Sequence, residues 1–232
     1  MSDPRADVAA ALRRLGVLAV AGVLDDADLG AAAGELAGLA SRLEERAGPG
    51  RPPRERPDVE GSPADFFPAS PVMGSHNPIA PPVHLWAVTG EGGGREIAGT
   101  ANFDYRYEGP PTCVHGGVIA EVFDEMLGSA NLVAGAPGMT GTLKVRYRRP
   151  TPLRTDIRLE ARFVERSGRK ISTWAGMYAG DELTAEAEGI FIEVAPEQML
   201  AIAEANVDSA DPTIVEAIRA EARRVDREGF TD

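Results

Sequence analysis

The residues best suited to chemistry lie in one short stretch, GPPTCVHGGVIAEVFDEM, at residues 109–126. Two adjacent glycines, Gly116 and Gly117, begin an apolar run that carries three carboxylates. Glycine is a poor helix former, costing about 1 kcal/mol relative to Ala in a helix interior. At a helix start, however, bare backbone lets a ligand oxygen approach the unpaired N–H groups and the positive end of the helix dipole. The stretch therefore suits an anion or a polarised carbonyl, although the same glycines would also allow a tight strand-to-helix turn.

Helical spacing distinguishes the three carboxylates, Glu121, Asp124 and Glu125. Gly117 and Asp124 are seven residues apart, which places them on one helix face within about 20° but about 10 Å apart along the axis. One small reacting group cannot touch both within a single chain, so the spacing predicts a homodimer with two equivalent sites at its interface. Asp124 has apolar neighbours, where a desolvated carboxylate could act as base or nucleophile. Glu121 and Glu125, one turn apart, are expected to share a more solvated stripe.

Other catalytic and metal-binding residues are sparse. The chain has one cysteine and three histidines, which excludes an internal disulfide framework and argues against a metal site. Cys113 lies close to His115, but no orienting partner is recognisable, and we expect the thiol to pack as a small apolar group. We predict neither a metal nor an organic cofactor, and a reduced, cytoplasmic protein. The apolar run at residues 15–24 has acidic flanks and is shorter than the roughly 20 residues of a membrane span.

The net charge of −12 argues against nucleic-acid binding, but it is unevenly distributed. Residues 140–172 carry ten Lys and Arg against three acidic residues. Such a basic segment in an acidic protein is either a candidate binding site for an anionic ligand or the solvated face of a strand.

The rest of the chain predicts an α+β domain between helical extensions. Residues 5–46 are helical in pattern with a break near 24–26, and Pro-rich residues 48–71 lack any periodicity. Alternating segments predict six strands around the helix, at 84–88, 96–103, 142–147, 157–165, 170–178 and 183–193. Asp211-Pro212 predicts the start of a last helix. The predicted units are an N-terminal helical arm (1–47), a linker (48–71), the main domain (72–195) and a C-terminal helical extension (196–232).

The segment VHGGVIAEVFDE, followed by MTGTLKVRYRRPTPL at residues 139–153, resembles the hotdog-fold acyl-coenzyme A thioesterases, and most closely their PaaI-like branch. The resemblance covers residues 72–194. It implies an antiparallel sheet wrapped around a long central helix, and hydrolysis of an acyl-CoA thioester to a free acid and coenzyme A. Coenzyme A would then be part of the substrate. The resemblance also implies a homodimer or a dimer of dimers.

The same resemblance assigns roles at the site. Asp124 would be the general base or the nucleophile, and the Gly117 N–H of the other subunit would polarise the thioester carbonyl. His115 would orient the bound thioester, and Thr140 would position water or assist the aspartate. Gly109 departs from the pattern, because some active relatives carry a water-holding Asn there.

Residues expected to bind the substrate and its phosphates are Gly116, Asn77, Lys144, Arg146, Arg148, Arg149, Arg169 and Lys170. The alternative to an enzyme is a non-catalytic protein that binds acyl-CoA or lipid, with the terminal arms as contact surfaces. Hydration is disfavoured, because hotdog hydratases pair an Asp and a His a few residues apart on one loop, and no such pairing is present.

Overall fold

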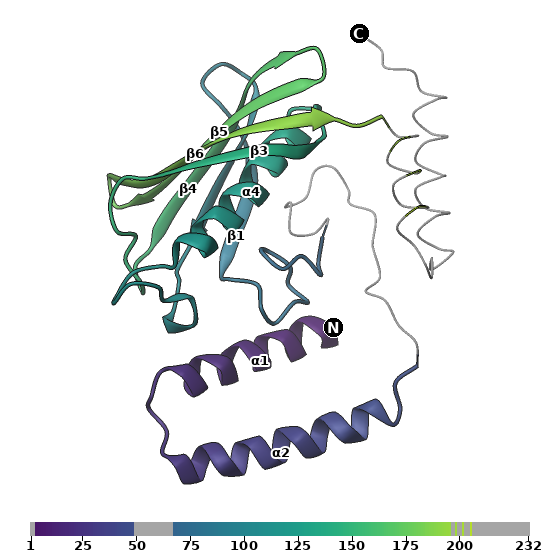
Figure 1. Cartoon of the computed structure of the whole chain (residues 1–232), viewed down its shortest axis with the longest axis vertical. Coiled ribbons are helices and arrows are strands. Elements are labelled where there is room, and N and C mark those ends of the chain that lie inside the picture. The colour runs from purple at the N-terminus through teal and green to yellow at the C-terminus, as the bar shows by residue number, and fades with distance from the viewer. Residues whose placement is uncertain (1–2, 49–66, 196–197, 199–200, 202–204, 206–232) are drawn as a thin grey trace.

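The computed structural model describes residues 3–48 and 67–195, together with 198, 201 and 205. Within this part, two N-terminal helices lie beside a six-stranded antiparallel sheet that holds one long helix (Figure 1). Most of the predicted linker and the predicted helix after Asp211 lie outside the described residues. The division into four units stays a prediction.

The two helices of the arm begin at acidic caps. The Asp3 carboxylate accepts the Arg5 N–H at the start of α1 (Pro4–Val20), where proline occupies the first helical position. The Asp25 carboxylate accepts the Asp28 N–H at 2.8 Å and starts α2 (Asp26–Glu44). The predicted break between the two helices is confirmed.

The sheet has the strand order β1-β2-β4-β5-β6-β3, so β1 and β3 are its edges. The strands are β1 (Val83–Thr89), β2 (Arg95–Ala101), β3 (Gly138–Tyr147), β4 (Ile157–Ser167), β5 (Lys170–Ala179) and β6 (Glu182–Glu193). Gly168 and Gly180 adopt φ of +59° in the tight turns β4–β5 and β5–β6, a conformation that favours glycine. All six predicted strands are confirmed, with slightly different ends.

Helix α4 (Gly116–Val133) packs against one face of this sheet and supplies the centre of the core. Its residues Phe123, Met126 and Leu127 are fully enclosed, as are Ile97 and Ile171 of the strands. A short 3₁₀ turn, η1 (Tyr105–Tyr107), precedes the loop that leads into the helix. This arrangement is the hotdog fold that the resemblance implies.

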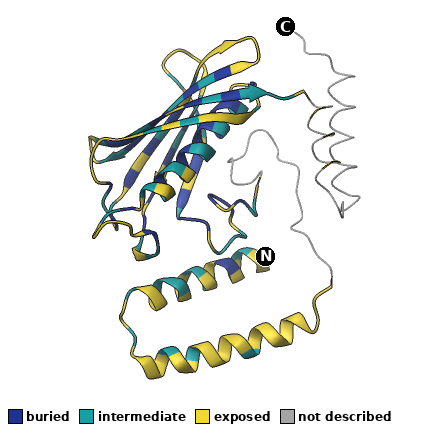
Figure 2. Cartoon of the chain, viewed as in Figure 1, coloured by how far each residue is buried: buried dark blue, intermediate teal, exposed yellow. Residues whose placement is uncertain are grey.

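The arm attaches to this domain through α1. Ala9 is its one buried residue, and the Arg13 guanidinium donates to the carbonyls of Gly74, Ser75 and Asn77 at 2.8–3.1 Å. The His76 ring pairs with the Asp3 carboxylate at 2.6 Å. Helix α2, in contrast, has no buried residue (Figure 2). Among the described helices, none is long and apolar enough to cross a membrane.

Candidate active site

The start of α4 is organised by His115, which caps the helix. His115 Nδ1 accepts the Gly117 N–H at 3.0 Å, which requires the ring to carry its proton on Nε2. The His115 N–H in turn donates to the Tyr107 carbonyl at 2.8 Å. The Gly116 N–H, the first of the helix, has no hydrogen-bond partner among the described residues. A ligand therefore finds the Gly116 N–H free, whereas the Gly117 N–H is engaged until His115 turns away.

Both glycines also lie close to neighbouring side chains. A Cβ on Gly117 would lie 3.0 Å from His115 Nδ1, and one on Gly116 would lie 3.3 Å from the Tyr147 hydroxyl. That hydroxyl donates to the Gly116 carbonyl at 2.8 Å and ties the end of β3 to the helix start. The structural reason for the glycines and the chemical one are thus both present. The sequence predicts only that Tyr147 ends a strand, and no sequence signal indicates this contact with the helix start.

The loop before the helix leaves no room for a side chain at position 109. A Cβ on Gly109 would lie 2.7 Å from His115 Cα. An Asn at this position would have to displace the histidine backbone.

Asp124 is held by Thr140, as the resemblance implied that the threonine could do. The Thr140 hydroxyl donates to Asp124 Oδ1 at 2.8 Å, and the aspartate is half-buried. The pair depends on a bulge in β3, where Thr140 opposes Phe191 and Thr142 opposes the next residue, Ile190. In a regular strand without the bulge, Thr140 and Thr142 are two residues apart and would share the outward face. The bulge turns the hydroxyl toward α4, a use of bulges that is common next to active sites.

The expectation of a solvated stripe holds for Glu121, which is exposed, but is wrong for Glu125. The Ser70 hydroxyl donates to Glu125 Oε2 at 3.3 Å, and the segment around Ser70 covers the carboxyl. Burial raises the pKa of Glu125, an effect that the Ser70 hydrogen bond opposes and the nearby charge of Asp124 reinforces. Helical spacing could not reveal this, because the covering residues belong to a segment that was assigned to the linker.

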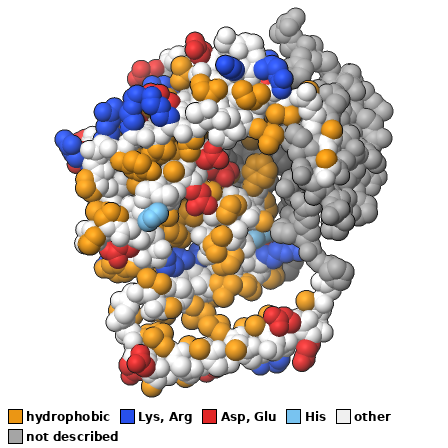
Figure 3. All heavy atoms as spheres, viewed as in Figure 1, with side chains coloured by type: hydrophobic (Ala, Val, Ile, Leu, Met, Phe, Trp, Pro, Cys, Tyr) orange, Lys and Arg blue, Asp and Glu red, His pale blue; other side chains and the backbone are white. Residues whose placement is uncertain are grey.

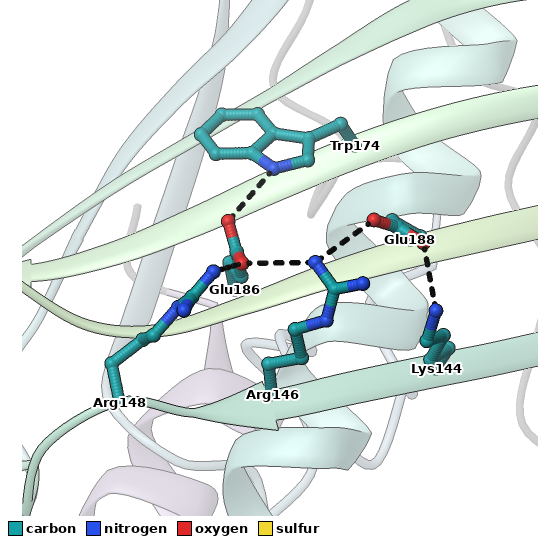
Figure 4. A network of polar contacts seen from close by, with 6 residues as sticks. All are labelled: Lys144, Arg146, Arg148, Trp174, Glu186 and Glu188. Atoms are coloured by element: carbon teal, nitrogen blue, oxygen red, sulfur yellow. Dashed lines mark hydrogen bonds and ion pairs between the residues drawn. The ribbon is translucent and has the colours of Figure 1, made fainter.

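The basic residues of β3 lie on the sheet face opposite α4. Leu143 and Val145 pack toward the core, so the alternating Lys144 and Arg146 point away from it. Figure 4 shows Lys144, Arg146 and Arg148 reaching Glu186 and Glu188 of β6, with the Trp174 indole N–H donating to Glu186 at 3.4 Å. The Arg148 hydrogen bond is the main reason that the pKa of Glu186 is lowered.

The other predicted binding residues are spread over the domain. Arg149 pairs with Glu182 at 3.2 Å, and Arg169 donates to the Glu193 carbonyl at 3.1 Å. Lys170 is exposed and has no ion pair within the described part of the chain. The Asn77 side chain bonds within its own loop, to the Ala69 carbonyl and the Ile79 N–H. None of these residues is brought beside Asp124, and their roles in binding stay predictions.

The face that carries α4 is largely apolar in the space-filling view, with acidic side chains near its centre (Figure 3). Lys and Arg side chains gather at one edge of this view. Cys113 is half-buried. Within the described residues, no group of three His, Cys, Asp or Glu side chains could hold a metal.

Comparison with known proteins connects this geometry to a family. Residues 112–186 match the model of the thioesterase superfamily. A crystal structure of a thioesterase superfamily protein has a TM-score of 0.71 and 33% identity, and the match covers 83% of this chain and 92% of that one.

Curated relatives include acyl-coenzyme A thioesterase THEM4 of Bos taurus, 33% identical over 93 residues, and that of Xenopus laevis, 33% identical over 91 residues. These two matches cover 39% and 38% of this chain, and 38% and 41% of the relatives' own length.

Proposed function

This chain belongs to the thioesterase superfamily, and on that premise we propose that it hydrolyses an acyl-CoA thioester to a free carboxylic acid and coenzyme A. The observation that carries the proposal is the Thr140–Asp124 hydrogen bond, on the helix whose first N–H is free. A carboxylate held by a hydroxyl is suited to accept a proton from water. A free N–H at a helix start is suited to a developing oxyanion. Acyl-CoA as the substrate class is supported by the THEM4 relatives.

The proposed site is shared between two copies of the chain. Gly116 is eight residues from Asp124, about 12 Å along the helix axis, too far for both to contact one carbonyl group. Edge strand β3 carries Thr140 and has one unpaired side in the single chain. A two-fold axis beside β3 would align the helices in opposite directions and bring the partner subunit's Gly116 toward Asp124. We therefore propose a homodimer, alone or within a dimer of dimers.

The proposed reaction needs only water and the residues already described, without a metal or an organic cofactor. Water attacks the thioester carbon while Asp124 accepts its proton, and the carbonyl oxygen gains charge against the Gly116 N–H. The C–S bond then breaks, and the proton on Asp124 passes to the leaving thiolate. If Asp124 were instead the nucleophile, it would form a mixed anhydride with the acyl group and release the thiolate; attack of water on the aspartyl carbon during one turnover in H₂¹⁸O would then leave ¹⁸O in Asp124, which mass spectrometry of the peptide detects.

The phosphates of coenzyme A are proposed to bind at the cations in and after β3 and at the β4–β5 turn. These cations are Lys144, Arg146, Arg148, Arg149, Arg169 and Lys170. Most of these cations are paired with glutamates of β6, and the exposed pairs among them, Lys144–Glu188 and Arg149–Glu182, contribute only about 0–1 kcal/mol each. A phosphate can therefore displace a glutamate at modest cost. Lys170 is available without any such exchange.

The experiment is a panel of short, long and aryl acyl-CoAs, with the released thiol measured by a colorimetric reagent. We expect turnover of at least one class, and a loss of about 10²–10⁴-fold in kcat for Asp124→Asn, which keeps the shape but removes the base. Full activity of Asp124→Asn would exclude the proposed mechanism. Saturable binding of acyl-CoA without turnover would instead support the non-catalytic alternative.

A further inference from the structure

One buried polar side chain of α4, that of Asn131, has no part in the proposed mechanism and no hydrogen-bond partner among the described residues. Asn131 is 0% exposed, and neither its Nδ2 nor its Oδ1 has a hydrogen-bond partner in the part of the chain that the structure describes. A buried amide atom without a partner costs about 1–3 kcal/mol, and native proteins leave few such atoms. Leucine, of similar size, would fill the position without this cost. If Asn131 only packed in the core, its unpaired amide would destabilise the fold without any compensating role.

Asn131 lies on the helix face that carries the site. Gly117, Asp124 and Asn131 recur every seven residues, so each is rotated by only about 20° from the one before. Asp124 and Asn131 are separated by about 10 Å along the axis. Between them, one turn after Asp124, stands Gly128, where an added Cβ would meet only the Phe191 ring, at 3.8 Å. The helix surface between Asp124 and Asn131 therefore carries no side chain at its midpoint, Gly128.

The two halves of an acyl-CoA have opposite requirements at such a site. The coenzyme half must extend into solvent, because its phosphates are charged, whereas the acyl half can be enclosed. A fully buried residue such as Asn131 suits the enclosed acyl half of the substrate and not the coenzyme half, which must reach solvent. Its neighbours Leu127 and Ala130 are buried and apolar, which suits an alkyl or aryl chain. Because Asn131 is enclosed in the free chain, the acyl group must open this space as it enters.

We propose that Asn131 is a specificity-determining residue, which binds a neutral hydroxyl at the far end of the acyl group. This inference rests on the proposed thioester hydrolysis. A primary amide donates through Nδ2 and accepts through Oδ1, and a hydroxyl can do both in return. An ionised carboxylate is disfavoured, because Asp124 and Glu125 already place negative charge on the same helix. A separation of about 10 Å corresponds to an extended acyl chain of roughly eight carbons.

The test compares octanoyl-CoA with 8-hydroxyoctanoyl-CoA, two substrates that differ only in the terminal hydroxyl. We expect the wild-type protein to have a kcat/KM about tenfold higher for the hydroxyl substrate, as one buried hydrogen bond implies. Asn131→Leu should abolish or reverse this preference while raising the melting temperature. Ser129→Ala, which truncates another buried polar residue of α4, serves as the matched control and should keep the preference.

Binding of the same two compounds to Asp124→Asn, measured by calorimetry, separates the two proposals. The inference is overturned if the affinity ratio of the two compounds is unity, or if Asn131→Leu leaves that ratio unchanged. A rise in melting temperature with no change in the ratio would show that Asn131 is merely an unsatisfied packing residue. Absence of turnover with both compounds and with the wider panel overturns the hydrolase proposal alone, because the binding ratio is still measured.

Discussion

Thr140→Val tests the catalytic reasoning most directly, because it removes one hydroxyl and keeps the β-branched shape of the side chain. The lost hydrogen bond is the one to Asp124 Oδ1, 2.8 Å long. Hydrogen bonds to charged groups contribute about 1.5–3 kcal/mol. If this stabilisation holds the base in its working orientation, kcat should fall by roughly 10–100-fold, since 1.36 kcal/mol corresponds to a factor of ten.

The assay is steady-state hydrolysis of the best acyl-CoA from the panel, with kcat and KM determined separately. The melting temperature of Thr140→Val is measured alongside, so that a loss of folded protein is distinguished from a loss of the orientation of Asp124. Thr140→Ser retains the hydroxyl and should restore most of the activity. A Thr140→Val protein with wild-type kcat would refute the view that the threonine orients Asp124. An equal loss in both variants would show that the hydroxyl alone does not account for the effect, because Thr140→Ser keeps the hydroxyl and removes only the methyl group.

Two further predictions concern the residues around this pair. Burial raises the pKa of Glu125, so its favourable contribution to stability is fully present below the unfolded-state pKa and is lost as pH rises through the folded-state pKa. Glu125→Gln should therefore have a melting temperature that exceeds that of the wild type by a growing margin as pH rises above about 4.5. Calorimetry measures this margin, and a margin independent of pH would contradict the raised pKa of Glu125. Arg13→Ala removes the guanidinium that α1 inserts against three loop carbonyls, and should lower the free energy of unfolding by about 1–3 kcal/mol. Chemical denaturation measures this, with the exposed Arg14→Ala as the control, and equal values for the two variants would show that the arm does not depend on Arg13.

Most of the sheet could be predicted because its signals are local. Gly168 and Gly180 mark tight turns, and the alternation of polar and apolar residues fixes the strands on either side. The position of β3 at the far edge, paired with β6 rather than with β4, depends on long-range pairing that no local pattern encodes. The basic strand illustrates the consequence. Ten cations in residues 140–172 suggested an anion site, whereas glutamates of β6 approach them only in the folded sheet.

The candidate site was predictable where a single helix determines it. Asp124 and the glycines lie on one helix, so their spacing could be computed from the sequence. Glu125 was misjudged because its environment comes from Ser70, 55 residues earlier in the chain. The contact of Thr140 was expected from the resemblance, but its cause, the bulge at 141, was not visible in the sequence. Residues on one element can thus be placed by periodicity, and contacts between elements cannot.

At the start of α4, two neighbouring N–H groups differ in whether they have a hydrogen-bond partner. A helix start has more donors than acceptors, and here the capping His115 satisfies one of them, the N–H of Gly117. The Gly116 N–H stays free, and the Tyr147 hydroxyl holds the carbonyl of the same residue, which fixes the orientation of that glycine. In the proposed mechanism, His115 would act without touching the thioester, because it holds the backbone that presents the free donor. The two glycines would then have different roles: Gly117 allows the cap, and Gly116 would meet the substrate.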